Sequence, residues 1–87
     1  MIKVSKIIIP ANQTVLLVQE NEAVSVLFDR APIWAGGLSD LSNEENRINI
    51  GFMGQKQLLL AKGDTLYGYS GEFDGPRTVI MLITSQH

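Results

Sequence analysis

Short runs of apolar residues, either alternating with polar residues or continuous, are separated by turn residues along most of the chain. Runs of about four to eight residues that are rich in Val, Ile, Leu and Tyr and bounded in this way predict β-strands. The pattern predicts strands at residues 2–9, 14–19, 24–28, 48–52, 57–60, 65–70 and 77–84. Asn21 and Glu22 predict a hairpin turn, and Gly63 predicts a turn with a positive φ. The expected fold class is therefore all-β: a small antiparallel β-sandwich or jelly-roll-like barrel of about seven short strands.

Two of the predicted strands, "TVLLV" at residues 14–18 and "TVIMLI" at residues 78–83, are apolar at consecutive positions. Because successive side chains of a strand point to opposite faces, only one set can fill the core of a two-layer sandwich. The other set needs a second cover, which either a long loop of the same chain or a neighbouring subunit would supply. We expect self-association, with a trimer as the favoured number of copies, through Leu16, Val18, Ile80 and Leu82.

The polar, glycine-containing segment from Gly36 to Arg47 predicts one long mid-chain loop, and "RAPIW" before it predicts an extended edge segment. Together, the residues from Asp29 to Arg47 form the one exposed segment large enough to carry binding specificity. Ser39 or Ser42 is a candidate cap for one helical turn in "LSNEEN". Loops carry binding specificity more often than strands do, and tryptophan is enriched in interface hot spots. The loop is therefore expected to contact a partner through Arg30, Trp34, Asp40, Glu44, Glu45 and Arg47. The alternative is that Trp34 plugs one end of the sandwich.

Composition narrows the classes of function. The 87 residues make one domain, with 45% hydrophobic and 18% charged residues. The net charge is −2 and basic residues form no run, so nucleic-acid binding is not expected. The chain contains no cysteine, which excludes disulfides and zinc–thiolate sites. Lys3 and Lys6 interrupt the first apolar run, and no stretch reaches the ~20 apolar residues of a membrane span, so neither a signal peptide nor membrane insertion is expected.

Candidate chemistry is sparse. The only histidine is His87, the last residue, so no Ser-His-Asp or Cys-His site is predicted. Asp40, Glu44 and Glu45 share the long loop but lack the spacing of a calcium-binding EF-hand, which favours a solvated acidic loop. No enzymatic activity, cofactor or metal is expected.

Four aromatic residues support a second class of function. The rings could form a stacking platform for a sugar, as in small carbohydrate-binding β-sandwich modules: Trp34, Tyr67, Tyr69 and Phe73. Tyrosines at strand spacing are also ordinary in β-sheets, where they fill the core or an interface with the hydroxyl at a wet edge.

Three pieces of the chain resemble a group of small structural proteins of tailed bacteriophages. They are "LLVQEN" at residues 16–21, "INIGFMGQKQLLLAKGDTLYGYS" at residues 48–70 and "TVIML" at residues 78–82. The intervening "RAPIWAGGLSDLSNEEN" is longer and more acidic than the short glycine loop of that group. The resemblance implies a non-enzymatic virion protein of the capsid-decoration or head-fibre-base type. It further implies a capsid or tail protein as partner, and location in the virion after assembly in the host cytoplasm.

Overall fold

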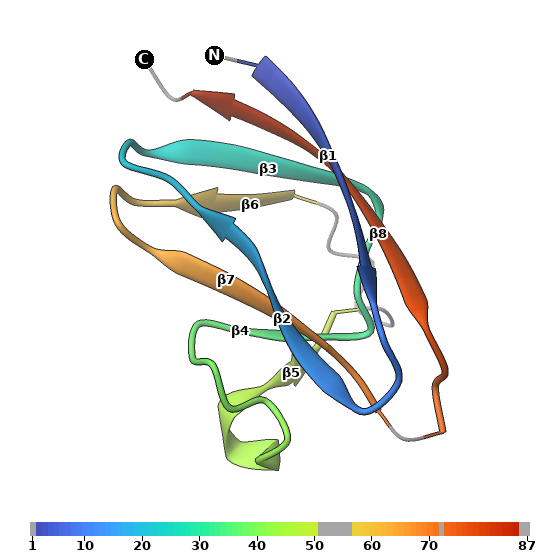
Figure 1. Cartoon of the computed structure of the whole chain (residues 1–87). Coiled ribbons are helices and arrows are strands. Elements are labelled where there is room, and N and C mark those ends of the chain that lie inside the picture. The colour runs from blue at the N-terminus through green and yellow to red at the C-terminus, as the bar shows by residue number, and fades with distance from the viewer. Residues whose placement is uncertain (1, 51–56, 72, 86–87) are drawn as a thin grey trace.

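The computed structural model describes residues 2–50, 57–71 and 73–85 of the chain (Figure 1). One 3₁₀ turn, η1 (Glu44–Asn46), lies between the fourth and fifth strands. The described residues form eight strands: β1 (Ile2–Ile9), β2 (Gln13–Gln19), β3 (Val24–Arg30), β4 (Trp34–Gly36), β5 (Ile48–Asn49), β6 (Gln57–Leu60), β7 (Thr65–Ser70) and β8 (Arg77–Ser85). The prediction of an all-β domain is confirmed, with one strand more than the sequence pattern indicated.

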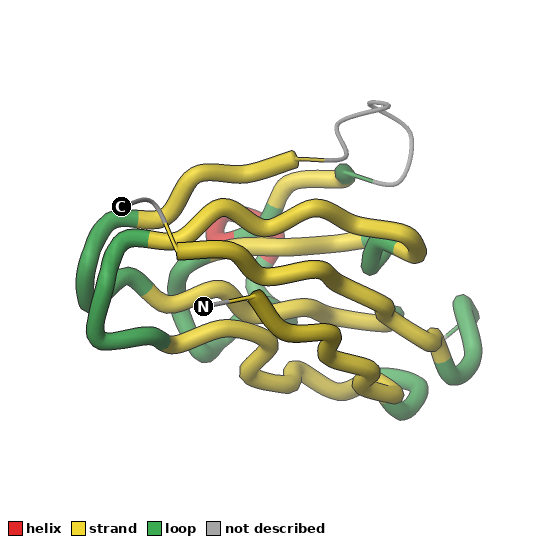
Figure 2. The backbone as a smooth tube through the Cα atoms, turned by 90° about the horizontal axis from the view of Figure 1, so that it is seen from above, coloured by secondary structure: helices red, strands yellow, loops and turns green. Residues whose placement is uncertain are grey.

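The strands of the described residues form two four-stranded antiparallel sheets that lie face to face, as the view along the layers in Figure 2 shows. Sheet A has the order β1-β8-β3-β6, and sheet B has the order β2-β7-β4-β5. The first strand thus pairs with the last, the second with the seventh, the third with the sixth and the fourth with the fifth. This nested pairing is that of a jelly roll, so the predicted fold class is confirmed.

Four local predictions need correction. Asn21 and Glu22 do turn the chain, but they carry it from sheet B to sheet A, because β2 and β3 belong to different sheets. The short strand β4 joins the predicted edge segment to the predicted loop, and it pairs with β5 and β7 on its two sides, so it is not an edge strand. The cap of η1 is Asn43, whose side chain accepts a hydrogen bond from the backbone N–H of Glu45, rather than Ser39 or Ser42. Of the strand predicted at 48–52, β5 covers Ile48–Asn49, and Phe52 lies outside the described residues.

The core lies between the two sheets and is built mainly from β3 and β8. Val26 is fully buried and Met81 is 1% exposed, and both strands alternate as the sequence pattern predicts. The side chains that share this inward face are Val24, Val26 and Phe28 of β3 and Val79, Met81 and Ile83 of β8. Each fully buried side chain of this kind stabilises the fold by roughly 1.5–3 kcal/mol.

A bulge in β2 changes which of its side chains face the core. Leu16 pairs with Tyr67 and Val18 pairs with Leu66, so Leu17 is an extra residue between two ladder positions. Leu17 and Val18 are consequently both buried, while Leu16 is exposed. This corrects the expectation that Leu16 and Val18 share one face, and it places Val18 in the core.

Candidate binding surface

Part of the outer face of sheet B, over β4 and the adjoining β7, is covered by the chain's own loop, residues 37–47. Leu41, a residue of this loop, is fully buried against the sheet. The loop sits so close to β4 that a Cβ atom placed on Gly36 would lie 2.7 Å from Cδ2 of Leu41. One of the two covers expected from the sequence, a long loop of the same chain, is therefore present over sheet B.

Arg47 fixes the loop to the sheet. Its guanidinium carbon lies 4.5 Å from the ring centroid of Trp34 and 4.9 Å from that of Tyr69, which are paired on β4 and β7. Its Nη1 atom donates a hydrogen bond of 3.0 Å to the carbonyl oxygen of Leu41. Arg47 and Trp34 thus contact other residues of the same chain. Trp34 lies under the loop and not at the end of the sandwich. That they also contact a partner stays a prediction.

Replacing Arg47 with alanine is expected to lower the free energy of unfolding by about 2 kcal/mol, because two cation–π contacts and a hydrogen bond are lost. Lysine at this position would keep the charge but not the planar fork, so a smaller loss is expected. Arg30→Ala, at an exposed position of β3, serves as the control with a change within about 0.5 kcal/mol. Urea unfolding measures all three, and equal midpoints for the Arg47 and Arg30 variants would refute the anchoring role.

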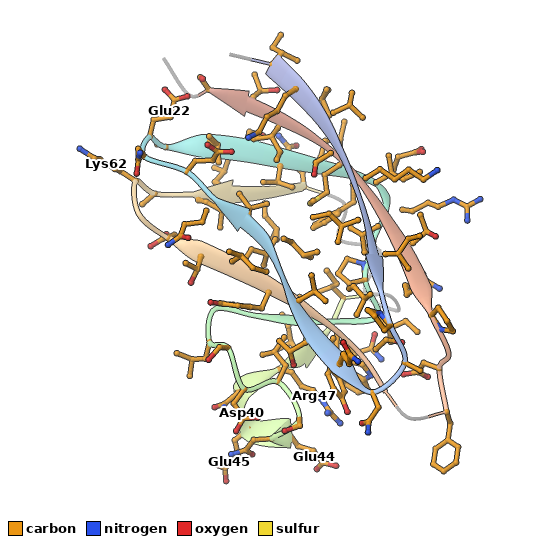
Figure 3. All side chains as sticks on the ribbon, viewed as in Figure 1. Glu22, Asp40, Glu44, Glu45, Arg47 and Lys62 are labelled. Atoms are coloured by element: carbon orange, nitrogen blue, oxygen red, sulfur yellow. The ribbon has the colours of Figure 1, made fainter. Side chains whose placement is uncertain are left out.

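The acidic part of the loop forms a compact turn with its carboxylates in solvent. Ser42 donates a 2.6 Å hydrogen bond to Oδ1 of Asp40, and the side-chain amide of Asn46 donates one of 2.8 Å to the carbonyl of Asp40. Figure 3 shows Asp40, Glu44 and Glu45 at the opposite end of the molecule from Glu22 and Lys62. The remaining predicted loop residue, Arg30, lies apart from this turn, because it pairs with Ile80 in sheet A. Among the described residues, no three His, Cys, Asp or Glu side chains gather closely enough to hold a metal ion.

The aromatic residues do not share one platform. The rings of Trp34 and Tyr69 face the guanidinium of Arg47, and the hydroxyl of Tyr69 donates a 3.1 Å hydrogen bond to Oδ1 of Asn12. Phe73 is almost fully exposed, in the segment between β7 and β8. Tyr67 shares the outer face of sheet B with Trp34 and Tyr69, so Phe73 is the ring that lies apart, and sugar binding by these aromatic residues stays a prediction.

Apolar side chains run across the outer face of sheet A, which the described part of the chain does not cover, and the polar Ser25, Gln57 and Thr84 lie between some of them. Strand register places Val4 of β1, Leu82 of β8 and Leu27 of β3 in one row across three strands. Val4 is 73% exposed and Leu27 is 46% exposed. The other apolar side chains on this face are Ile2, Ile8, Leu59 and Ile80. These seven side chains are called the apolar face below.

The central strand β8 explains why "TVIMLI" is apolar at consecutive positions. Val79, Met81 and Ile83 fill the core, whereas Ile80 and Leu82 belong to the apolar face. Together with Val4 and Leu27, they line a shallow hollow of about 240 Å³. Charged residues interrupt the face in the next row, where Lys6 and Arg30 pair with Ile80 on its two sides, and Ile8 lies beyond that row.

The four residues predicted for self-association are thus divided among three places. Ile80 and Leu82 are on the apolar face, Leu16 is on the outer face of sheet B, and Val18 is in the core. The sequence prediction missed Val4, Leu27 and Leu59. The repeated apolar residues at positions 2, 4 and 8 of β1 carried the relevant signal, but only the register shows that they lie beside Leu82.

Comparisons of the chain with protein-family models, with curated proteins and with solved structures found no match. Within the described residues, no helix has the length and apolar character needed to cross a membrane. The function proposed below therefore rests on the fold, the surfaces of the protein and the sequence.

Proposed function

We propose that this chain is a non-enzymatic structural protein that self-associates through the apolar face and forms part of a phage virion surface. The apolar face is the observation that carries the self-association. With strands about 4.8 Å apart and about 3.3 Å per residue, sheet A presents a flat area of about 19 Å by about 25 Å. This corresponds to roughly 480 Å², below the ~800 Å² per partner of a standard interface, so the contact belongs with the small specific interfaces.

A second copy of the same chain suits this face. Its central row, Val4, Leu82 and Leu27, is uncharged, as in the centre of most protein interfaces. A flat face that packs on its own kind makes an isologous contact, which closes after two copies. We therefore propose a dimer. The trimer that the sequence favoured remains untested and is the alternative.

Placement in a virion rests on two supports. Jelly rolls with two Greek keys recur in viral capsid domains, and the strand pairing of this chain has that pattern. The sequence resemblance to small tailed-phage structural proteins points the same way. The exposed Asp40, Glu44 and Glu45 form an acidic end on a fixed loop, which suits attachment to a basic patch of a capsid or tail protein.

Light scattering after size-exclusion chromatography tests self-association. At micromolar concentration, the wild-type chain is expected at twice its 9.6 kDa mass. Leu82→Lys should give a monomer with an unchanged circular dichroism spectrum, because the charge would be buried at the centre of the contact. Leu16→Lys, on the outer face of sheet B, should stay associated. A monomeric wild type at several hundred micromolar, or equal behaviour of both variants, would refute the proposal.

Mass spectrometry of purified particles of the phage that encodes the chain tests the virion assignment separately. The protein should be detected in particles, and acidic-loop variants with Glu44 and Glu45 replaced by lysine should be depleted from them. Absence of the protein from intact particles would overturn the assignment and leave the self-association result unaffected.

A further inference from the structure

A cavity of about 550 Å³ opens between the two sheets on the side where β5 and β6 are the edge strands. One wall carries Ile48 and Ile50, and the other carries Leu58 and Leu60. Asp64, in the turn before β7, and Thr65, the first residue of β7, also line it and are called its polar rim. The volume falls within the range of about 300–1,000 Å³ that is typical of small-molecule sites. It is called the edge cavity below.

The edge cavity leaves apolar side chains in contact with water although they point toward the interior. Ile48 pairs with the buried Ala35 and is nevertheless 59% exposed, and Leu58 and Leu60 are only half-buried. The inward side chains of the central strands β3 and β8 are, in contrast, all nearly inaccessible. An apolar molecule in the edge cavity would remove this surface from water and extend the core.

The polar groups at the rim restrict the chemistry of the occupant. The hydroxyl of Thr65 already donates a 2.9 Å hydrogen bond to the carbonyl of Gly37. Oδ2 of Asp64 accepts a 3.0 Å hydrogen bond from the backbone N–H of Ala61, which leaves the carboxylate with further acceptor capacity. Among the described residues of the lining, Asp64 is the charged one, and its carboxylate favours a hydrogen-bond donor or a cation over an anion.

We propose that the edge cavity binds a small amphiphile whose apolar body lies between β5 and β6 and whose amine or hydroxyl group faces Asp64. The site is separate from the apolar face, because its walls are inner surfaces of both sheets, whereas the apolar face is the outer surface of sheet A. Ligand binding here therefore does not depend on the proposed self-association.

Three ten-carbon probes test the site by calorimetric titration: decylamine, decan-1-ol and decanoate. Decylamine and decan-1-ol should bind, with decylamine about fivefold tighter than decanoate because of Asp64. Asp64→Asn should abolish that preference and leave the affinity for decan-1-ol unchanged. No binding of decylamine at millimolar concentration or of decan-1-ol up to its solubility limit would overturn the proposal, as would retention of the preference in the Asp64 variant.

Matched variants on one strand locate the binding. The side chain of Leu58 lines the edge cavity. Leu58→Trp should therefore fill the space and weaken decan-1-ol binding about tenfold. Leu59→Trp points outward from the same strand and should leave the affinity unchanged. Because Leu58→Trp could disturb folding, Ile48→Trp on the opposite wall, at an already exposed position, provides a second filling variant. If Leu59→Trp weakens binding as much as the filling variants, the probe binds the apolar face and the proposal is wrong.

Discussion

Replacing Gly36 with alanine is expected to lower the free energy of unfolding by about 3 kcal/mol, the upper part of the range for overpacking. The added methyl group would overlap the backbone carbonyl of Asn46 and lie 2.7 Å from Leu41. A backbone oxygen cannot rotate away, so the whole loop 37–47 would have to lift from sheet B. Arg47 would then lose its contacts with the rings of Trp34 and Tyr69. For a domain of this size, the melting temperature should fall by roughly 10–20 °C.

Gly37→Ala is the matched control, since its Cβ would meet only the carbonyl oxygen of Thr65 at 3.7 Å, an ordinary contact. Its melting temperature should stay close to that of the wild type. Trp34, the one tryptophan of the chain, lies under Arg47 and reports on the loop by fluorescence. A shift of its emission to longer wavelength is expected in Gly36→Ala alone. If both glycine variants have the same melting temperature and neither changes the emission of Trp34, the loop is not held against β4 as described.

The sequence predicted the fold class because hydrophobic periodicity and turn residues are local signals. It did not predict sheet membership, because a turn such as that at Asn21 and Glu22 has the same composition whether the next strand pairs with the last one or crosses to the other sheet. It also missed β4, a three-residue strand that contains Gly36 and is ordered by pairing with β7 and β5. Such pairing depends on residues far away in the chain.

The candidate surfaces were only partly predictable for the same reason. The bulge that buries Val18 shifts the parity of β2 by one residue, and a period-2 pattern cannot show it. Trp34 and Arg47 were each predicted, by residue type, to contact a partner, whereas the contact of Arg47 with the rings of Trp34 and Tyr69 requires the loop to fold back onto sheet B. The apolar face became visible only when the register placed Val4 and Leu27 on either side of Leu82.

Met81 and Leu82 are neighbours on β8 with side chains on opposite faces, so alanine at each position separates folding from association. Met81 is 1% exposed between the sheets, and Met81→Ala is expected to cost about 3 kcal/mol through lost burial and the cavity left behind. This loss should not depend on protein concentration, because the core belongs to one chain.

Leu82→Ala should cost the isolated chain about 1 kcal/mol or less, since its side chain is only half-buried. It should instead weaken association, so its melting temperature should depend less on protein concentration than that of the wild type. Thermal melts over a hundredfold range of concentration measure both effects. An equally large, concentration-independent loss in the two variants would mean that both faces of β8 are buried within a single chain.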